Sequence, residues 1–139
     1  MSIRIFYDKE GIRLKGIRKL FDVIKSLITE ENRIPGDISF IITGDSELKS
    51  LNIEFLAHDY YTDVITFNYN KGDIVAGEIY ISVDTVALNA EEFSVTVQEE
   101  LKRVIIHGVL HLVGMEDTTE EERQIMHEAE DKWLQRSCK

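Results

Sequence analysis

The spacing of apolar residues along the chain predicts five helices. Apolar side chains recur at intervals of three and four from about Lys15 to Glu30, as expected of an amphipathic helix. Thr119 followed by Glu122 forms a capping box, which is a sequence signature of a helix start. The predicted helices are about 15–30, a helix capped by Asp45 or Ser46 and running to Leu56, about 83–93, about 97–113, and a last helix from the capping box through Leu134.

Short apolar runs bounded by polar residues predict four strands, at residues 3–7, 37–43, 64–67 and 78–82. Pro35 and Gly36 are expected to break the chain just before the second strand. The turn at residues 70–73 is expected to join the last two strands into a hairpin. Strands joined by helices, then a hairpin, then helices predict an α+β fold, an α/β sandwich with a small mixed four-stranded sheet.

Length and composition favour a single domain over residues 1–139, because a chain of this length can bury one core. No apolar run approaches the roughly 18 residues of a membrane-spanning helix, and the first residues resemble a strand rather than a signal peptide. The single cysteine, Cys138, excludes a disulfide framework. These features predict a cytoplasmic protein with neither a membrane partner nor a disulfide partner.

The net charge of −10 disfavours nucleic acid as a partner, since phosphate contacts need Lys and Arg. The charge is unevenly distributed, because residues 1–35 carry eight basic and five acidic side chains. This positive excess is a candidate phosphate-binding face, with an ordinary solvated helix as the alternative. Its members on the first predicted helix and just before it are Arg13, Lys15, Arg18, Lys19 and Lys25.

Two histidines of the fourth predicted helix, in the C-terminal half of the chain, give the strongest indication of chemistry. His107 and His111 lie four residues apart in an apolar segment, so both rings project from one helical face and can bind one metal ion. Gly114 can end this helix in a left-handed turn, and the carboxylate of Asp117 can then supply a third ligand. Two histidines and one carboxylate with an open fourth position are typical of a catalytic zinc site. The alternative is a structural pair of packed histidines.

The residues around the two histidines narrow the choice of reaction. Zinc peptidases place a glutamate directly after the first histidine as general base, whereas this chain has Gly108 there. Iron oxygenases with these ligand types take them from barrel strands, and zinc deaminases need a Pro-Cys-x-x-Cys segment that is absent here. A metal without an adjacent glutamate suits reactions in which the ion polarises the substrate and activates water, such as phosphodiester hydrolysis.

Two further residues carry structural predictions. A glycine inside a helix costs about 0.8–1 kcal/mol relative to alanine, so Gly108 is expected to mark a close approach of another element. His127 on the last helix is expected to be a partly exposed surface histidine.

Residues 107–117 resemble the signature His-Gly-x-Leu-His-Leu-x-Gly-x-Asp-His of the YbeY-type endoribonucleases. Residues 62–67, Thr-Asp-Val-Ile-Thr-Phe, are similar to the family's Thr-Asp-Val-Leu-Ser-Phe, and residues 77–82 resemble its following strand, Gly-Asp-Ile-x-Ile. The resemblance extends over nearly the whole chain. It implies a bacterial, zinc-dependent, single-strand-specific endoribonuclease that matures the 3′ end of 16S ribosomal RNA and acts in ribosome quality control, with RNA and the ribosome as partners.

The resemblance also implies the roles of the metal ligands. His107, His111 and Asp117 are expected to hold one zinc ion, with nickel or another divalent metal as the alternative, and a metal-bound water is the expected catalytic group. Asp117 stands where the family carries a third zinc histidine, and carboxylate oxygen is an acceptable zinc ligand. Glu116 is the competing third ligand.

Outside the metal ligands, two departures from the family concern the chemistry of the site. Leu56 replaces an arginine that serves catalysis or substrate binding, and His58 replaces a nearby lysine. His58 is therefore a candidate catalytic group, with an ordinary loop histidine as the alternative, and Thr66 is a candidate substrate contact. The basic residues Arg13, Arg18 and Lys19 are expected to steer RNA or the ribosome.

The loss of the arginine leaves two other functions open, because an apolar side chain cannot hold a phosphate or stabilise its developing charge. One is a metal-stabilised ribosome-assembly factor that cleaves weakly or not at all. The other is a metal-dependent hydrolase of a different substrate.

Overall fold

The computed structural model describes residues 2–56 and 63–137, apart from the side chain of Leu56. These residues form one mixed four-stranded sheet of β1 (Ile3–Tyr7), β2 (Ile34–Thr43), β3 (Val64–Asn68) and β4 (Ile74–Ser82), in the order β1-β2-β4-β3. β2 pairs in parallel with both β1 and β4, whereas β3 and β4 form an antiparallel hairpin. The predicted mixed sheet and its hairpin are confirmed.

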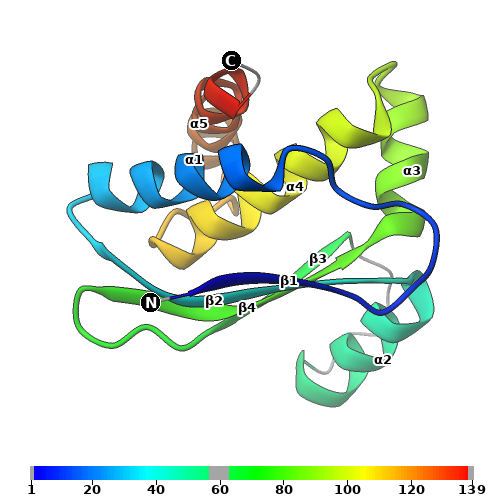
Figure 1. Ribbon diagram of the computed structural model, residues 1–139, viewed down its shortest axis with the longest axis horizontal. Helices are drawn as coiled ribbons and strands as arrows, with labels where there is room; N and C mark the ends of the chain where they lie inside the picture. Colours follow the sequence, from blue (N-terminus) through cyan, green and yellow to red (C-terminus); the bar gives the residue numbers. More distant parts are fainter. Residues whose placement is uncertain (1, 57–62, 138–139) are drawn as a thin grey trace.

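Five helices accompany the sheet, as predicted: α1 (Ile17–Glu30), α2 (Asp45–Leu56), α3 (Val83–Glu92), α4 (Val97–Leu112) and α5 (Glu120–Ser137). Helices α1 and α4 lie on one face of the sheet, and α5 packs on the outside of both, while α2 lies towards the opposite face (Figure 1). Helix α4 therefore occupies the middle of the molecule, between the sheet and α5.

The core lies between the sheet and α1 and α4. Alternate residues of the central strands, Phe40 and Ile42 of β2 and Ile79 and Ile81 of β4, are fully buried on this face. The matching stripe of α1 recurs at helical spacing and is equally buried. Burying a side chain of this size stabilises the fold by about 1.5–3 kcal/mol. The stripe consists of Leu20, Val23, Ile24, Leu27 and Ile28.

Two strands begin earlier than predicted. β2 starts at Ile34, so Pro35 and Gly36 do not break the chain; instead the pairing with β4 shifts register between Pro35 and Ile38. A proline is tolerated at such an irregularity because its missing N–H removes no regular ladder bond. β4 correspondingly starts at Ile74 and runs beside this extension.

The predicted cap of α2 was wrong, because Asp45 is the first residue of the helix rather than its cap. Its carboxylate instead accepts hydrogen bonds from the hydroxyls of Ser82 and Thr85, the latter at 2.6 Å. Asp45 therefore ties the start of α2 to the start of α3. Helix α1 also begins slightly late, at Ile17, after Gly16 in the left-handed conformation.

No helix within the described ranges is both long and apolar enough to cross a membrane.

Candidate metal centre

Helix α4 presents the two histidines on one face, as predicted. The helix begins at a Thr96 cap, whose hydroxyl accepts a hydrogen bond from the Glu99 amide at 3.1 Å. One helical turn separates His107 from His111, and their Nε2 atoms are 3.0 Å apart. The spacing of four residues is therefore sufficient to bring the two ring nitrogens together.

The turn after α4 brings the third ligand back to the histidines. Gly114 adopts a φ of 106°, and the amides of Gly114 and Met115 donate to the carbonyls of His111 and Leu110, both at 3.0 Å. This glycine-terminated helix end reverses the chain. Asp117 Oδ2 then lies 3.4 Å from His107 Nε2 and 3.5 Å from His111 Nε2.

The three ligand atoms fit a metal ion. Their separations of 3.0, 3.4 and 3.5 Å match the edge of a tetrahedron, which is about 3.3 Å for metal–ligand bonds of about 2.0–2.1 Å. Within residues 2–56 and 63–137, His107, His111 and Asp117 form the group of metal-ligating types whose ligand atoms all lie within 4.8 Å. Glu116, the competing ligand, is exposed. The side chains of His107, His111 and Asp117 are 22%, 28% and 37% exposed, so the centre is open to a substrate on one side.

The other ring nitrogen of each histidine has a partner that orients the ring. His111 Nδ1 lies 3.0 Å from the carbonyl oxygen of Met115, which can only accept, so Nδ1 is the donor and Nε2 is the nitrogen left for a metal ion. His107 Nδ1 lies 2.5 Å from Glu130 Oε2 on α5, and an ionised carboxylate imposes the same arrangement. Both Nε2 atoms therefore face the position of the third ligand. Metal ligation requires that Nε2 of each ring be deprotonated.

Glu130 is itself held by a cation. Its Oε1 accepts a hydrogen bond from Arg103 Nη1 at 3.1 Å, and Arg103 also donates from Nη2 to Asp131 Oδ1 at 2.6 Å. The Glu130 side chain is only 9% exposed, so the guanidinium provides the compensating charge that a buried carboxylate needs.

The charges around His107 shift several pKa values. Burial alone would lower the pKa of His107, but the hydrogen bond and charge of Glu130, with Asp117 and Asp63, raise it above its ordinary value. Burial raises the pKa of the Asp63 carboxyl, against the opposing effect of His107. Burial likewise raises the pKa of Glu100. Asp63 and Glu100 line a hollow of about 90 Å³ beside His107, which has room for water but not for a nucleotide.

The chain around the centre is held by side chains that sequence reasoning missed. Arg123 on α5 donates from Nη1 to the carbonyls of Asp117 at 3.4 Å and Thr118 at 3.1 Å. Asn70, from the hairpin turn, donates to the carbonyl of Leu112 at 2.7 Å. These bonds satisfy carbonyls at the end of α4 and in the loop that carries Asp117.

The sequence contains a pattern from which the importance of Glu130 could have been predicted. It lies on the buried face of α5 with Met126 and Trp133, at intervals of four and three residues. A carboxylate on the apolar face of an amphipathic helix needs a buried partner, and that requirement points to a polar site beneath the helix. Which residue supplies the partner follows only from the packing of α5 on α4.

Gly108 marks a close approach of another element, as expected. A Cβ at Gly108 would lie 2.9 Å from Cγ2 and 3.1 Å from Cδ1 of Ile79 on β4. The contact lets α4 settle closely on the sheet between the two histidines. His127, also as expected, is largely exposed, and its ring lies 3.5 Å from Asp131.

Thr66 lies on the side of the sheet that faces α4. It pairs across the hairpin with Ile79, and cross-strand partners share a face of the sheet. Its role as a substrate contact remains a prediction. His58 lies outside the described residues.

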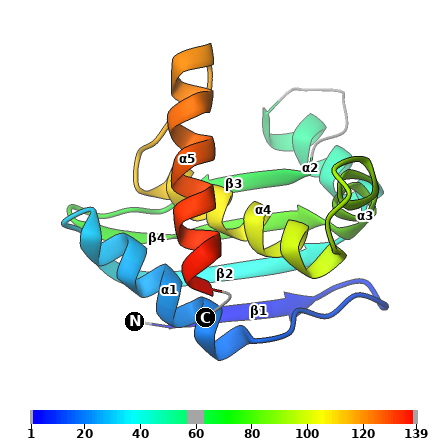
Figure 2. The same cartoon turned by 90° about the horizontal axis from the view of Figure 1, so that it is seen from above.

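The basic residues lie on another part of the molecule. Arg18 and Lys19 are exposed in the first turn of α1, on the β1 side of the helix layer, whereas α4 runs towards β3 (Figure 2). The guanidinium of Arg13 stacks on the ring of Tyr7, 4.5 Å from its centroid. The structure does not bring these three residues to the metal ligands, and steering of RNA stays a prediction for them.

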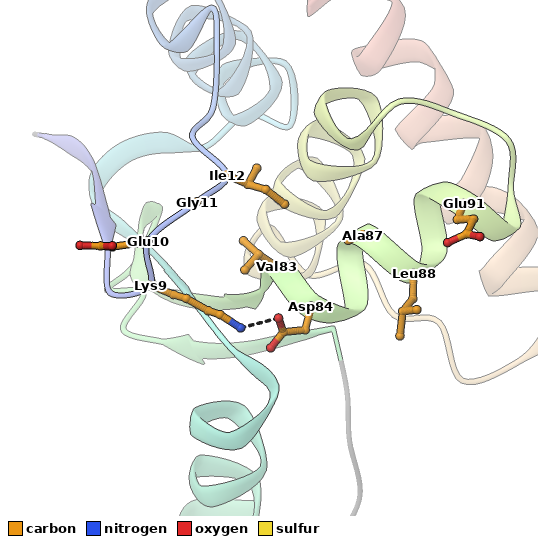
Figure 3. Close-up of a pocket in the computed structure, with 9 residues that line it drawn as sticks. All are labelled: Lys9, Glu10, Gly11, Ile12, Val83, Asp84, Ala87, Leu88 and Glu91. Carbon is orange, nitrogen blue, oxygen red and sulfur yellow. Dashed lines mark hydrogen bonds and ion pairs between the residues drawn. The ribbon is translucent and has the colours of Figure 1, made fainter.

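A larger hollow of about 440 Å³ lies apart from the metal centre, between the loop after β1 and helix α3 (Figure 3). Lys9 and Asp84 form an ion pair within its lining, to which Ile12 and Val83 also belong. The ion pair engages Lys9 and Asp84 and lowers the pKa of Asp84, while Glu10 and Glu91 also line the hollow. Among the described residues, these side chains form no group of metal-ligating atoms as closely spaced as that of His107, His111 and Asp117.

Comparison with known proteins finds relatives along nearly the whole chain. A family model described as endoribonuclease YbeY matches residues 5–137. The endoribonuclease YbeY of Bacteroides thetaiotaomicron is 42% identical over 132 residues, which cover 94% of this chain and 96% of that protein. The endoribonuclease YbeY of Christiangramia forsetii is 47% identical over 126 residues, covering 91% and 88%. The solution structure of TM1509 from Thermotoga maritima superposes with a TM-score of 0.69 at 31% identity, covering 98% of this chain and 89% of that one.

Proposed function

This chain belongs to the endoribonuclease YbeY family, and we propose that it is a metal-dependent endoribonuclease that cuts single-stranded RNA at the His107–His111–Asp117 centre. Endoribonucleases are hydrolases of internal phosphodiester bonds. The resemblance to YbeY-type enzymes supports ribosomal RNA as the substrate, with maturation of the 16S 3′ end and ribosome quality control as the cellular role and the cytoplasm as the location.

The observation that carries this proposal is that three ligand atoms lie close together and that both imidazole rings are oriented by partners at Nδ1. His107 Nε2, His111 Nε2 and Asp117 Oδ2 lie 3.0–3.5 Å apart, and each histidine has its Nδ1 engaged elsewhere. Imidazole and carboxylate ligands support zinc as the metal, with nickel or another divalent ion as the alternative. A divalent ion held there supplies Lewis acidity towards water and towards a phosphoryl oxygen.

The side chains of the chain itself prepare the centre for that chemistry. Met115 and Glu130 hold the two imidazoles in the ligating tautomer before any substrate arrives. Asp117 adds a negative charge that a third histidine would not bring. This charge would make a bound metal ion a weaker Lewis acid towards water and towards a phosphoryl oxygen. The partial exposure of all three ligands leaves the fourth side accessible to a phosphodiester.

A ribosome-assembly factor with weak or no cleavage activity is the second candidate function. Leu56 stands where the family has an arginine, and the net charge of −10 opposes binding of RNA through its phosphates. Arg123 is a cation near the centre that could take the place of the missing arginine. Its Nη1, however, already donates hydrogen bonds to the backbone carbonyls of Asp117 and Thr118.

Cleavage of RNA by the zinc-loaded protein tests the proposal. We expect about one divalent ion per chain, and slow cutting of a single-stranded RNA that a matched duplex does not undergo. A chelator and His111→Ala should each abolish the cutting, because both remove the metal. Cutting that survives both treatments would indicate a contaminating nuclease. A metal-loaded protein that never cleaves would instead support the assembly factor.

A further inference from the structure

Glu130 stands out among the residues near the centre because both of its oxygens are engaged. One oxygen lies 2.5 Å from His107 Nδ1 and the other 3.1 Å from Arg103 Nη1. Arg103 and His107 are one helical turn apart on α4, so the carboxylate bridges two consecutive turns from the facing helix α5. The carboxylate therefore has little freedom to rotate away from the imidazole.

A carboxylate is a costly choice at this position of the α4–α5 interface. Its neighbours on the same face of α5, Met126 and Trp133, are buried apolar residues. Burying an ion pair between helices often stabilises a fold less than apolar packing of similar volume. The presence of Glu130 is therefore better explained by what it does to His107 than by its contribution to packing.

The two histidines differ in the partners of their Nδ1 atoms. His111 donates to a neutral backbone carbonyl, that of Met115 in the turn just after α4. His107 donates to an anion on another helix, 23 residues away in sequence. A carboxylate partner both fixes the tautomer of a ligating histidine and increases the basicity of its free nitrogen.

We propose that Glu130, held by Arg103, is a positioning residue that orients His107 for metal binding and couples the docking of α5 to the metal affinity of the centre. The inference rests on the metal centre of the proposed function. The coupling is reciprocal, because a contact that strengthens metal binding is itself strengthened when the metal is bound. Metal should therefore tighten the packing of α5 on α4.

Zinc affinity, measured by competition with a chromophoric chelator, tests the proposal on the full chain. We expect Glu130→Ala to bind zinc about 10- to 100-fold more weakly than the wild type, with Glu130→Gln between the two. The glutamine keeps the shape and an acceptor oxygen but loses the charge, so it also decides the result if the alanine variant fails to fold.

Asp131→Asn is the matched control. Asp131 also accepts a hydrogen bond from Arg103, but its side chain is half-exposed and it makes no contact with His107 in the described structure. Its zinc affinity should stay within about twofold of the wild type, since it reaches the metal only through Arg103.

Two further readouts separate positioning from general stability. In the zinc-loaded wild type, the His107 Nδ1–H proton should give a downfield NMR signal from its charge-assisted bond, shifted upfield in Glu130→Gln and unchanged in Asp131→Asn. Zinc should also slow amide exchange in α5 of the wild type more than in Glu130→Gln.

The outcomes separate this inference from the proposed function. A wild type that binds no zinc would overturn both. Tight zinc binding by the wild type that is unchanged in Glu130→Gln and Glu130→Ala would overturn the positioning role alone.

Discussion

At the scale of single residues, Asp117 decides the composition of the metal centre. A four-ligand zinc site is worth roughly 10–16 kcal/mol, or about 2.5–4 kcal/mol per ligand if shared equally. We therefore expect Asp117→Ala to weaken zinc binding by about two to three orders of magnitude. Isothermal titration with zinc measures this directly. Glu116→Ala is the control, because the exposed Glu116 should leave the affinity unchanged, and the reverse result would show that Glu116 is the ligand.

Leu56 is the second residue whose identity matters for activity. If the arginine of the family stabilises charge on the scissile phosphate, restoring it should help, because one such donor is worth about 2.7–4 kcal/mol in the transition state. Leu56→Arg is expected to raise the rate of RNA cleavage by up to about 100- to 1,000-fold. Single-turnover kinetics measure the increase. The double variant Leu56→Arg with His111→Ala should remain inactive. An unchanged rate in Leu56→Arg would show that an arginine at this position does not assist cleavage in this protein.

At the scale of elements, the fit of α4 on the sheet depends on Gly108. A methyl group there would meet the fully buried side chain of Ile79. Overpacking typically costs about 1–3 kcal/mol, and the helix gains back about 0.8–1 kcal/mol from alanine. We expect Gly108→Ala to lower the free energy of unfolding by up to about 2 kcal/mol in urea titrations.

A double-mutant cycle with Ile79→Ala isolates this contact. The combined variant should lose less stability than the sum of the two single variants, because removing the Ile79 side chain makes room for the new methyl group. Strict additivity, or a Gly108→Ala protein more stable than the wild type, would contradict close packing at this point.

At the scale of the whole molecule, buried carboxylates make stability depend on pH. The Glu100 side chain is almost completely buried, and burial raises its pKa above the ordinary value of 4.5. A raised pKa in the folded state favours the protonated form. Its contribution to stability is present below the unfolded pKa and is lost as the pH rises through the folded pKa. The wild type should therefore lose stability relative to Glu100→Gln over that interval.

Urea unfolding of both proteins at acidic and neutral pH checks this prediction. The glutamine variant should be the more stable protein at neutral pH, because it avoids a buried charge. Glu92→Gln, at an exposed position of α3, should follow the wild-type profile. Identical pH profiles for the wild type and Glu100→Gln would show that Glu100 does not cause the dependence.

Much of the fold was predictable from the sequence because it depends on local patterns. Helical spacing predicted five helices, alternation and short apolar runs predicted four strands, and the turn at 70–73 predicted the hairpin, all of which the structure confirms. Boundaries were less predictable. The extension of β2 through Pro35 depends on pairing with β4, and the start of α2 depends on Ser82 and Thr85, which lie far away in sequence.

The same division applies to the candidate site. The sequence by itself determined that His107 and His111 share a face, because a spacing of four residues is a property of any α-helix. The turn at Gly114 and the return of Asp117 could also be predicted from the sequence, because a glycine just after a helix is a local signal for a left-handed helix end. Only the tertiary structure decided that Glu130 and Arg103 complete the surroundings of His107. Their meeting depends on how α5 packs across α4, and no pattern along the chain specifies the partner that a buried charge will find on another helix.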